Sequence, residues 1–239
     1  LVTGAPIELY PIEPITDAML VSWFNGSMGG LALADVLLGE VSPSGKLPFT
    51  FPITLQDVPA YKLNTYPQQF SEETSDVFVD LVYRQKVRTQ RQLLAHYSEG
   101  IFVGYRWYDT KQQPVMYPFG HGLSYATFQY EGIQAKVKKD AVEVTFTLTN
   151  QGAMQAEEVV QLYASRPESA IERPAQELKT FQRVSLAPGE SKQVALTIPR
   201  DDFRHWDEAI GGWQVESGKV VLRVGTSSRE LSLQTEIQL

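Results

Sequence analysis

Alternating apolar and polar residues in the second half of the chain limit its fold more strongly than any other feature. Val142, Val144, Phe146 and Leu148 alternate with polar neighbours, and a turn follows at 150–152. Further apolar runs lie at 159–164, 178–186, 194–198, 213–215, 220–224 and 231–237. About seven strands at this spacing predict an all-β sandwich of the immunoglobulin-like type. The chain contains no cysteine, which excludes the disulfide-bridged antibody type.

The stretch from Tyr117 to Tyr125 marks the point where the chain changes character. Before it the sequence mixes a helix rich in small residues with long irregular runs, and after Thr127 the strand pattern is almost continuous. Gly120 and Gly122 stand among bulky aromatic residues. Glycine permits tight backbone bends, so this stretch predicts a sharp turn with aromatic rings buried on either side.

The start of the chain has the pattern of two short strands. Leu1–Leu9 predicts the end of a buried strand followed by a Gly/Pro turn, and residues 20–24 predict a second strand. The first residue is Leu1, where a strand pattern is already under way. We therefore expect this chain to be the later part of a longer one.

A helix is predicted over residues 25–39. Asn25 or Ser27 is expected to cap its start, and Gly39 to end it in a left-handed conformation. The helix is apolar on most faces, so we expect it to be buried on several sides. Such a helix belongs in the packed layer of an α/β unit, which a piece of about 50 residues does not complete.

The middle of the chain has weaker patterns. Pro43 and Gly45 predict a turn. The run around Lys46 lacks both the glycine spacing of a phosphate-binding loop and the helix that should follow, so that function is rejected. Residues 71–94 predict some helix or a hairpin, since an irregular loop of that length is rare. Residues 97–109 predict an extended segment packed against another part of the chain.

Composition excludes several classes of partner. The chain has 28 acidic and 21 basic residues and no basic run, which argues against nucleic acid. No window approaches the roughly 18 consecutive apolar residues of a membrane span. Without cysteine, neither disulfides nor thiolate chemistry is available, and the composition fits cytoplasm, periplasm or secretion equally well.

Two carboxylates, Glu99 and Asp109, flank an aromatic run as two acids around a sugar would. For glycoside hydrolysis both must face one pocket, about 5 to 9 Å apart. Two acids ten positions apart on an extended segment lie farther apart than this unless the chain folds back. We therefore favour surface or ion-paired acids over catalytic ones by roughly nine to one.

The other reactive and aromatic residues do not form a recognisable site either. His96, His121 and His205 are widely spaced, without a carboxylate at ligand spacing, so no metal site is expected. A nucleophile-elbow motif for acyl transfer is missing. Ring faces that could hold a sugar belong to Tyr105, Trp107, Tyr108, Trp206 and Trp213, but a core or interface position is favoured by about four to one. The residues alone therefore identify no catalytic, metal-binding or substrate-binding residue.

Several short sequence motifs, in order along the whole chain, resemble the C-terminal half of glycoside hydrolase family 3. In the first half they are Trp23 to Gly26, Gly29-Gly30, Ala34 to Leu37, Gly39, Ser42 to Pro48, Thr50 to Pro52, Glu99 to Arg106, Tyr108-Asp109 and Pro118 to Tyr125. In the second half Glu158 to Tyr163, Pro174, Leu178-Lys179, Phe181, Leu186 and Pro188 to Glu190 are similar to the family's fibronectin type III-like domain. The segment 71–94 departs from the family pattern, because it is longer and more charged.

The resemblance implies a multi-domain β-glycosidase. Family members carry an N-terminal (β/α)8 barrel, then an α/β sandwich domain, and often the fibronectin-like domain. They release β-linked sugars from non-reducing ends by a retaining double displacement. Their nucleophile is an aspartate on the barrel, and their acid/base is a glutamate upstream of the strand that Leu1–Leu9 matches. Neither has a counterpart in this chain, so no catalytic residue is carried over, and no cofactor is expected.

We therefore expect residues 1–60 to be the C-terminal part of an α/β sandwich domain, residues 61–126 a connecting region, and residues 127–239 a fibronectin type III-like β-sandwich. This chain alone is expected to be inactive. Its expected partners are the barrel, the rest of the α/β domain and a β-linked glycoside, with homo-oligomerisation left open. The alternatives are a non-catalytic carbohydrate-binding module and a structural interaction module.

Overall fold

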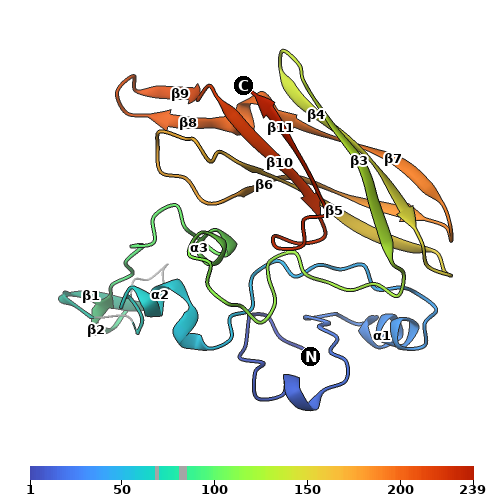
Figure 1. The fold of residues 1–239 in the computed structure, drawn as a ribbon. Coiled ribbons are helices and arrows are strands. Elements are labelled where there is room, and N and C mark those ends of the chain that lie inside the picture. Colours follow the sequence, from blue (N-terminus) through green and yellow to red (C-terminus); the bar gives the residue numbers. More distant parts are fainter. Residues whose placement is uncertain (68–69, 81–84) are drawn as a thin grey trace.

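The computed structural model describes the backbone of residues 1–67, 70–80 and 85–239 and the side chains of residues 1–67 and 92–239 (Figure 1). In chain order its elements are η1 (Glu13–Ile15), α1 (Gly29–Leu37), η2 (Leu55–Asp57), α2 (Pro59–Lys62), β1 (Phe70–Asp80), β2 (Gln85–Leu93), α3 (Tyr105–Thr110), β3 (Phe128–Val137), β4 (Ala141–Asn150), β5 (Ala156–Ser165), β6 (Glu177–Leu186), β7 (Ser191–Pro199), η3 (Arg200–Phe203), β8 (Arg204–Asp207), β9 (Gly212–Val215), β10 (Lys219–Gly225) and β11 (Leu233–Gln238).

The second half of the chain forms the predicted β-sandwich. One antiparallel sheet has the strand order β11-β10-β5-β6 and the other has the order β3-β4-β7. The strict alternation in β4 is the reason for this packing, because every second side chain of that strand is buried. These side chains meet those of the opposite sheet in one core, which contains Phe146, Leu162, Leu196 and Leu222.

The observed strands differ from the predicted ones at two places, since β3 was not predicted and the strand predicted at 213–215 lies outside the two main sheets. β3 belongs to the sandwich although its alternation is irregular, because a bulge between Glu131 and Gln134, with Gly132 at positive φ, shifts the pattern. The predicted strand 213–215 is β9, which lies outside the two main sheets and pairs only with β8. Seven strands do form the two sheets over 128–238, but their membership differs at these two places.

Strand β5 is buried on both faces over its last six residues, from Val160 to Ser165. One face packs into the sandwich core, and the other is covered by the stretch around Gly120 and by α3. A strand covered on both sides carries no alternation, which is why this part of the chain reads as a continuous apolar run. β5 is therefore the strand on which the two halves of the protein meet.

The predicted strands at Leu1–Leu9 and 20–24 are not formed within residues 1–67. The backbone joins them only where the Leu1 amino group donates to the Leu20 carbonyl at 2.7 Å and Ser22 N–H donates to the Leu1 carbonyl at 2.9 Å. A strand needs a ladder of such bonds to neighbouring strands, and this part of the chain offers none.

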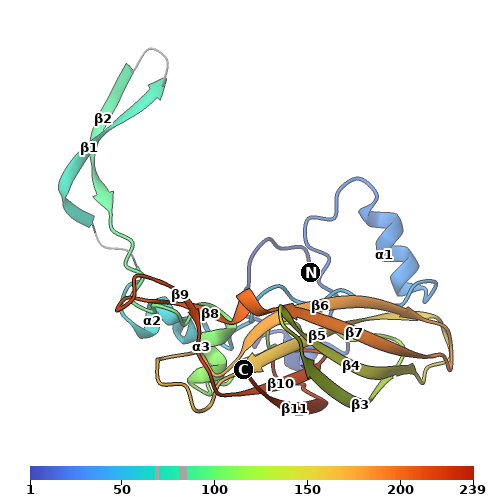
Figure 2. The ribbon, with the colours of Figure 1, turned by 90° about the horizontal axis from the view of Figure 1, so that it is seen from above.

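The predicted helix forms as α1, with two corrections. Its N-cap is Met28 and no side chain caps it, so the expected cap from Asn25 or Ser27 is wrong. The Asn25 side chain instead lies against Gly29, where an added Cβ would meet it at 2.3 Å. Gly39 is left-handed as predicted. Most of α1 is not buried against this chain, contrary to the expected burial, and it lies at the edge of the molecule in Figures 1 and 2.

The middle of the chain resolves the two open predictions. Residues 71–80 and 85–93 belong to the antiparallel strands β1 and β2, so the hairpin is confirmed and the helix alternative is wrong there, while 81–84 lie outside the described residues. Figure 2 shows this hairpin projecting away from the sandwich. The extended segment predicted for 97–109 is wrong, because turns occupy its first part and α3 its end. Gly104, at φ 62°, starts α3 and brings Tyr105 and Tyr108 onto one buried face. None of the helices in the described ranges is long and apolar enough to span a bilayer.

We predict that Phe146→Ala lowers the free energy of unfolding by about 3–5 kcal/mol, because it leaves a cavity in a close-packed core. Phe146 is fully buried and its ring stacks on Tyr130 with centroids 5.9 Å apart. Phe181→Ala on exposed β6 is the matched control and should cost far less. Urea unfolding followed by circular dichroism measures both, and equal losses would contradict the assigned core.

Candidate functional site

The first half of the chain is fixed to the sandwich at a junction of three segments, which we define as residues 42–51, residues 117–126 and strand β5. Backbone hydrogen bonds join the first two segments, from Leu47 N–H to the His121 carbonyl and from Gly120 N–H to the Leu47 carbonyl, both at 2.8 Å. An isolated bridge between Phe51 and Tyr117 extends this pairing. The two segments therefore form one layer that lies over β5.

A buried ion pair connects this layer to β5. The ammonium of Lys46 lies 2.8 Å from Glu158 Oε1, and the two side chains are only 10% and 6% exposed. Lys46 also donates to the Gly122 carbonyl at 2.7 Å, and Glu158 accepts from the Val159 N–H at 2.8 Å. Burial raises the pKa of Glu158, and the contacts to Lys46 and to the Val159 N–H oppose that rise. The Lys46–Glu158 ion pair and the hydrogen bond from Lys46 to Gly122 thus connect all three segments of the junction.

Gln161 is the second polar anchor of β5. Its amide donates to the carbonyls of Gly120 and Thr226, and its side-chain oxygen accepts from the Tyr163 hydroxyl at 2.6 Å. A Cβ on Gly120 would lie 2.2 Å from this amide, and one on Gly122 would lie 2.3 Å from the Gly45 carbonyl oxygen. Both glycines are therefore needed for close approach, and Gly120, at φ 80°, lies in the tight bend that the sequence predicted.

Aromatic rings lie on either side of this bend. Phe119 stacks on Tyr105 of α3 with centroids 4.7 Å apart, and Tyr117 stacks on His121 at 5.1 Å. The Tyr105 hydroxyl accepts from the Leu178 N–H of β6 at 2.7 Å, so α3 is tied to the same sheet. Rings therefore lie around the glycines as predicted, but Tyr117 and Phe119 are only partly buried and Tyr125 is 53% exposed, so the expected burial is not met.

One of the two candidate acids, Asp109, is engaged in an ion pair. Asp109 lies 2.9 Å from Arg229 Nε, and this guanidinium also donates to the carbonyls of Tyr108 and Gln113. Its carboxylate therefore joins α3 to the loop after β10. The Glu99 backbone carbonyl accepts from Phe102 N–H at 3.1 Å within a turn. Asp109 thus serves as an ion-paired acid.

The three histidines lie in three separate surroundings. His96 is exposed, His121 stacks on Tyr117, and His205 lies 3.3 Å from Arg173. Within the ranges that the structure describes, no three His, Asp or Glu side chains gather as metal ligands.

Five aromatic residues considered for sugar stacking fall into two groups. Tyr105, Trp107 and Tyr108 are buried, so the core interpretation is confirmed for them. Trp206 and Trp213, which face each other across the β8–β9 hairpin, are 52% and 63% exposed. Their rings meet edge to face with centroids 5.8 Å apart. A core position is therefore wrong for this pair.

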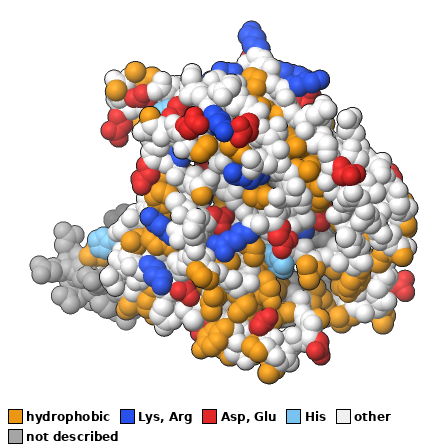
Figure 3. Space-filling view, viewed as in Figure 1, with side chains coloured by type: hydrophobic (Ala, Val, Ile, Leu, Met, Phe, Trp, Pro, Cys, Tyr) orange, Lys and Arg blue, Asp and Glu red, His pale blue; other side chains and the backbone are white. Residues whose placement is uncertain are grey.

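An open apolar face covers the N-terminal part of the chain. Leu31 of α1 is 59% exposed and Phe24 is 80% exposed. Other exposed apolar side chains of this segment are Ile15, Met28, Leu37, Leu38 and Val41. In Figure 3 hydrophobic side chains gather over the lower part of the molecule, where Figure 1 places this segment. An apolar surface of this extent is typical of an interaction site.

Sequence reasoning missed the residues that form the junction. Lys46 was rejected as a phosphate-loop lysine, and although it, Glu158 and Gln161 lie in runs that resemble the family, none of the three was assigned a contact. The one usable signal was the pair of polar residues inside a strand with no alternation, since buried polar groups require partners.

We predict that Lys46→Met lowers the free energy of unfolding by about 3–5 kcal/mol, because it leaves the Glu158 carboxylate buried without its partner. Adding Glu158→Gln to this variant should recover part of the loss. Lys219→Met removes an ion pair of the same 2.8 Å length, to Glu236, at a more exposed position, and should cost much less. Urea unfolding compares the variants, and equal losses in Lys46→Met and Lys219→Met would refute the role of burial.

We also predict that His121 makes stability fall on acidification. Burial lowers the pKa of His121 below its ordinary 6.5, Lys46 adds to this effect, and Glu230 opposes it. As pH falls through about 6.5 the unfolded chain takes up a proton before the folded chain does, so the free energy of unfolding decreases until the folded pKa is passed. His121→Phe keeps a ring on Tyr117 and should flatten this decrease between pH 7.5 and 5. Urea midpoints across that range test it, and parallel profiles for both proteins would contradict it.

Comparison with known families and proteins agrees with this architecture. Residues 1–105 match the glycosyl hydrolase family 3 C-terminal domain, and residues 158–228 match the fibronectin type III-like domain. The chain is 39% identical to the thermostable beta-glucosidase B of Acetivibrio thermocellus over 244 residues, which cover 100% of this chain and 29% of that protein. It is 39% identical to an exo-alpha-(1->6)-L-arabinopyranosidase of Bifidobacterium breve, covering 97% of this chain and 28% of that protein.

Solved structures give the same result. The beta-glucosidase of Kluyveromyces marxianus in complex with glucose aligns with a TM-score of 0.82 and 35% identity, covering 100% of this chain and 26% of that one. Beta-glucosidase 3B of Thermotoga neapolitana in complex with glucose aligns with a TM-score of 0.81 and 36% identity, covering 98% and 30%. The chain thus spans less than a third of the length of these proteins. It belongs to glycoside hydrolase family 3 and corresponds to the C-terminal portion of that family's enzymes.

Proposed function

We propose that residues 1–239 are the supporting C-terminal part of a retaining, exo-acting β-glycosidase that releases β-linked sugars from non-reducing ends. The catalytic carboxylates lie on a preceding segment or on a separate chain. The observation that carries this proposal is the match of the whole chain to less than a third of family 3 β-glucosidases. The use of Asp109 in an ion pair with Arg229 supports it, since that acid is then not available for chemistry.

The open apolar face supplies the contact that this function needs. In the proposed enzyme the face around α1 packs against the rest of the α/β domain, and through it supports the (β/α)8 barrel. Burying the exposed Leu31 side chain alone would contribute about 1.5–3 kcal/mol. We assign residues 1–60 to that α/β domain, 61–126 to the connecting region and 127–239 to the fibronectin type III-like sandwich.

The names of the relatives support a scaffold role rather than a role in sugar recognition. Proteins named beta-glucosidase and exo-alpha-(1->6)-L-arabinopyranosidase match this chain at the same 39% identity. Equal similarity to enzymes named for different sugars gives no indication that this portion distinguishes those sugars. We therefore propose that sugar specificity resides on the barrel.

A second candidate function is a non-catalytic carbohydrate-binding module. It is favoured by one observation, the exposed Trp206 and Trp213 pair on the β8–β9 hairpin. Titration of cello-oligosaccharides against the purified chain, followed by Trp fluorescence, separates the two candidates. The supporting role predicts little binding, whereas saturable binding that Trp213→Ala removes would favour the carbohydrate-binding module.

We predict that purified residues 1–239 do not hydrolyse an aryl β-glucoside and that activity requires the polypeptide carrying the barrel and the rest of the α/β domain. Leu31→Glu should reduce the activity of the complete enzyme, because it places a charge in the proposed contact. Ile210→Glu, at the tip of the β8–β9 hairpin and similarly exposed, is the matched control and should leave it unchanged. Turnover by the 239-residue chain alone would refute the placement of catalysis elsewhere.

A further inference from the structure

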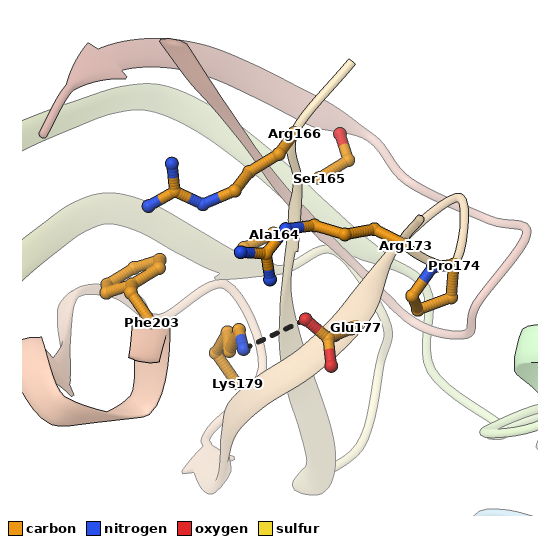
Figure 4. Close-up of a pocket in the computed structure, with 8 residues that line it drawn as sticks. All are labelled: Ala164, Ser165, Arg166, Arg173, Pro174, Glu177, Lys179 and Phe203. Carbon is orange, nitrogen blue, oxygen red and sulfur yellow. Dashed lines mark hydrogen bonds and ion pairs between the residues drawn. The ribbon is translucent and has the colours of Figure 1, made fainter. Parts of the chain in front are cut away.

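A small polar pocket lies at one end of the sandwich, away from the junction. It has a volume of about 10 Å³ and is formed by residues from the ends of β5 and β6, the loop before β6, and η3. Its lining residues are Ala164, Ser165, Arg166, Arg173, Pro174, Glu177, Lys179 and Phe203. In Figure 4 the cationic groups of Arg166, Arg173 and Lys179 lie around the same space.

The carboxylates near this pocket are already bound to two of the three cations. Glu177 lies 3.2 Å from Lys179, and Glu216 lies 3.1 Å from Arg173. Glu216 also accepts from the Ser169 hydroxyl at 2.7 Å, so its carboxylate is held in place. Among the described residues, Arg166 has no carboxylate within ion-pair distance.

Arg166 also has an unused hydrogen-bond donor. Its Nη1 donates to the backbone carbonyl of Glu216 at 2.8 Å, but its Nη2 is buried and has no partner among the described residues. Its guanidinium lies over the Phe203 ring, 5.8 Å from the centroid, so the aromatic face excludes water on that side. Burial lowers the pKa of Arg166 and the neighbouring Arg173 lowers it further, while Glu216 and Glu177 oppose this lowering. A cation with a buried, unpartnered donor is expected to bind a counter-charge.

We propose that this pocket binds one small inorganic anion, of the size of chloride, on Arg166 Nη2 between the other two cations. The volume sets the size, because about 10 Å³ holds one particle of roughly the size of water and leaves no room for sulfate or phosphate. The net charge favours an anion over a water molecule, since three cations surround the pocket while, in the part of the chain that the structure describes, only two carboxylates, Glu177 and Glu216, pair with them. The anion would hold the loop that contains Arg173 against η3.

The test is the halide dependence of thermal unfolding of the purified protein. Because a ligand that binds only the folded state stabilises it, chloride or bromide should raise the melting temperature to a plateau at constant ionic strength, with gluconate as the reference anion. Arg166→Met keeps an apolar stem on Phe203 and should weaken halide binding by about tenfold or more, since it removes a charge-assisted hydrogen bond. Arg204→Met, outside the pocket on β8, is the matched control and should bind halide like the unmodified protein.

A second variant, Glu177→Gln, should change the halide affinity in the opposite direction. It removes the carboxylate that neutralises Lys179, so halide should bind more tightly, and a loss of fold cannot produce this result. A bromide-soaked crystal should show an anomalous peak within hydrogen-bond distance of Arg166 Nη2. A melting temperature that is equal in halide and gluconate, a pocket holding water alone, or a pocket filled by a side chain from elsewhere in the protein would each overturn the proposal.

Discussion

The ion pair between Lys46 and Glu158 is the contact on which the arrangement of this protein depends. Both charges are removed from water, which is costly unless each finds an oppositely charged partner and further hydrogen bonds. The Gly122 carbonyl and the Val159 N–H supply those bonds. Because Lys46, Gly122 and Glu158 come from distant segments, they meet only when all three segments are in place. The pair therefore specifies one position of the first half of the chain on the sandwich.

This junction differs in chemistry from the other surface of the first half. The junction uses hydrogen bonds, an ion pair and two close-approach glycines, which require one geometry. The face around α1 is apolar and open. Burying it against a partner is favourable, but the hydrophobic effect does not fix the orientation of that partner. A supporting domain needs both properties, because a rigid attachment to the sandwich keeps the apolar face positioned for its partner.

Charge is distributed unevenly over the sandwich. The chain carries a formal net charge of −7, yet one end of the sandwich gathers three cations around a space the size of a single small particle. Ion pairs neutralise Arg173 and Lys179, while Arg166 keeps a buried donor without a partner. This local excess of positive charge lies on different elements from the junction.

The sequence by itself determined the sandwich, the tight bend at Gly120 and Gly122 and the left-handed end of the helix at Gly39. These follow from local rules, namely the two-residue period of a strand and the conformational freedom of glycine. The sequence motifs that resemble the family likewise indicated the family of the chain. The tertiary structure alone decided that Lys46 binds Glu158, that Asp109 binds Arg229, and that Trp206 and Trp213 are exposed. The strands expected at Leu1–Leu9 and 20–24 failed for the same reason, because pairing between segments far apart in sequence depends on which neighbours the fold brings together.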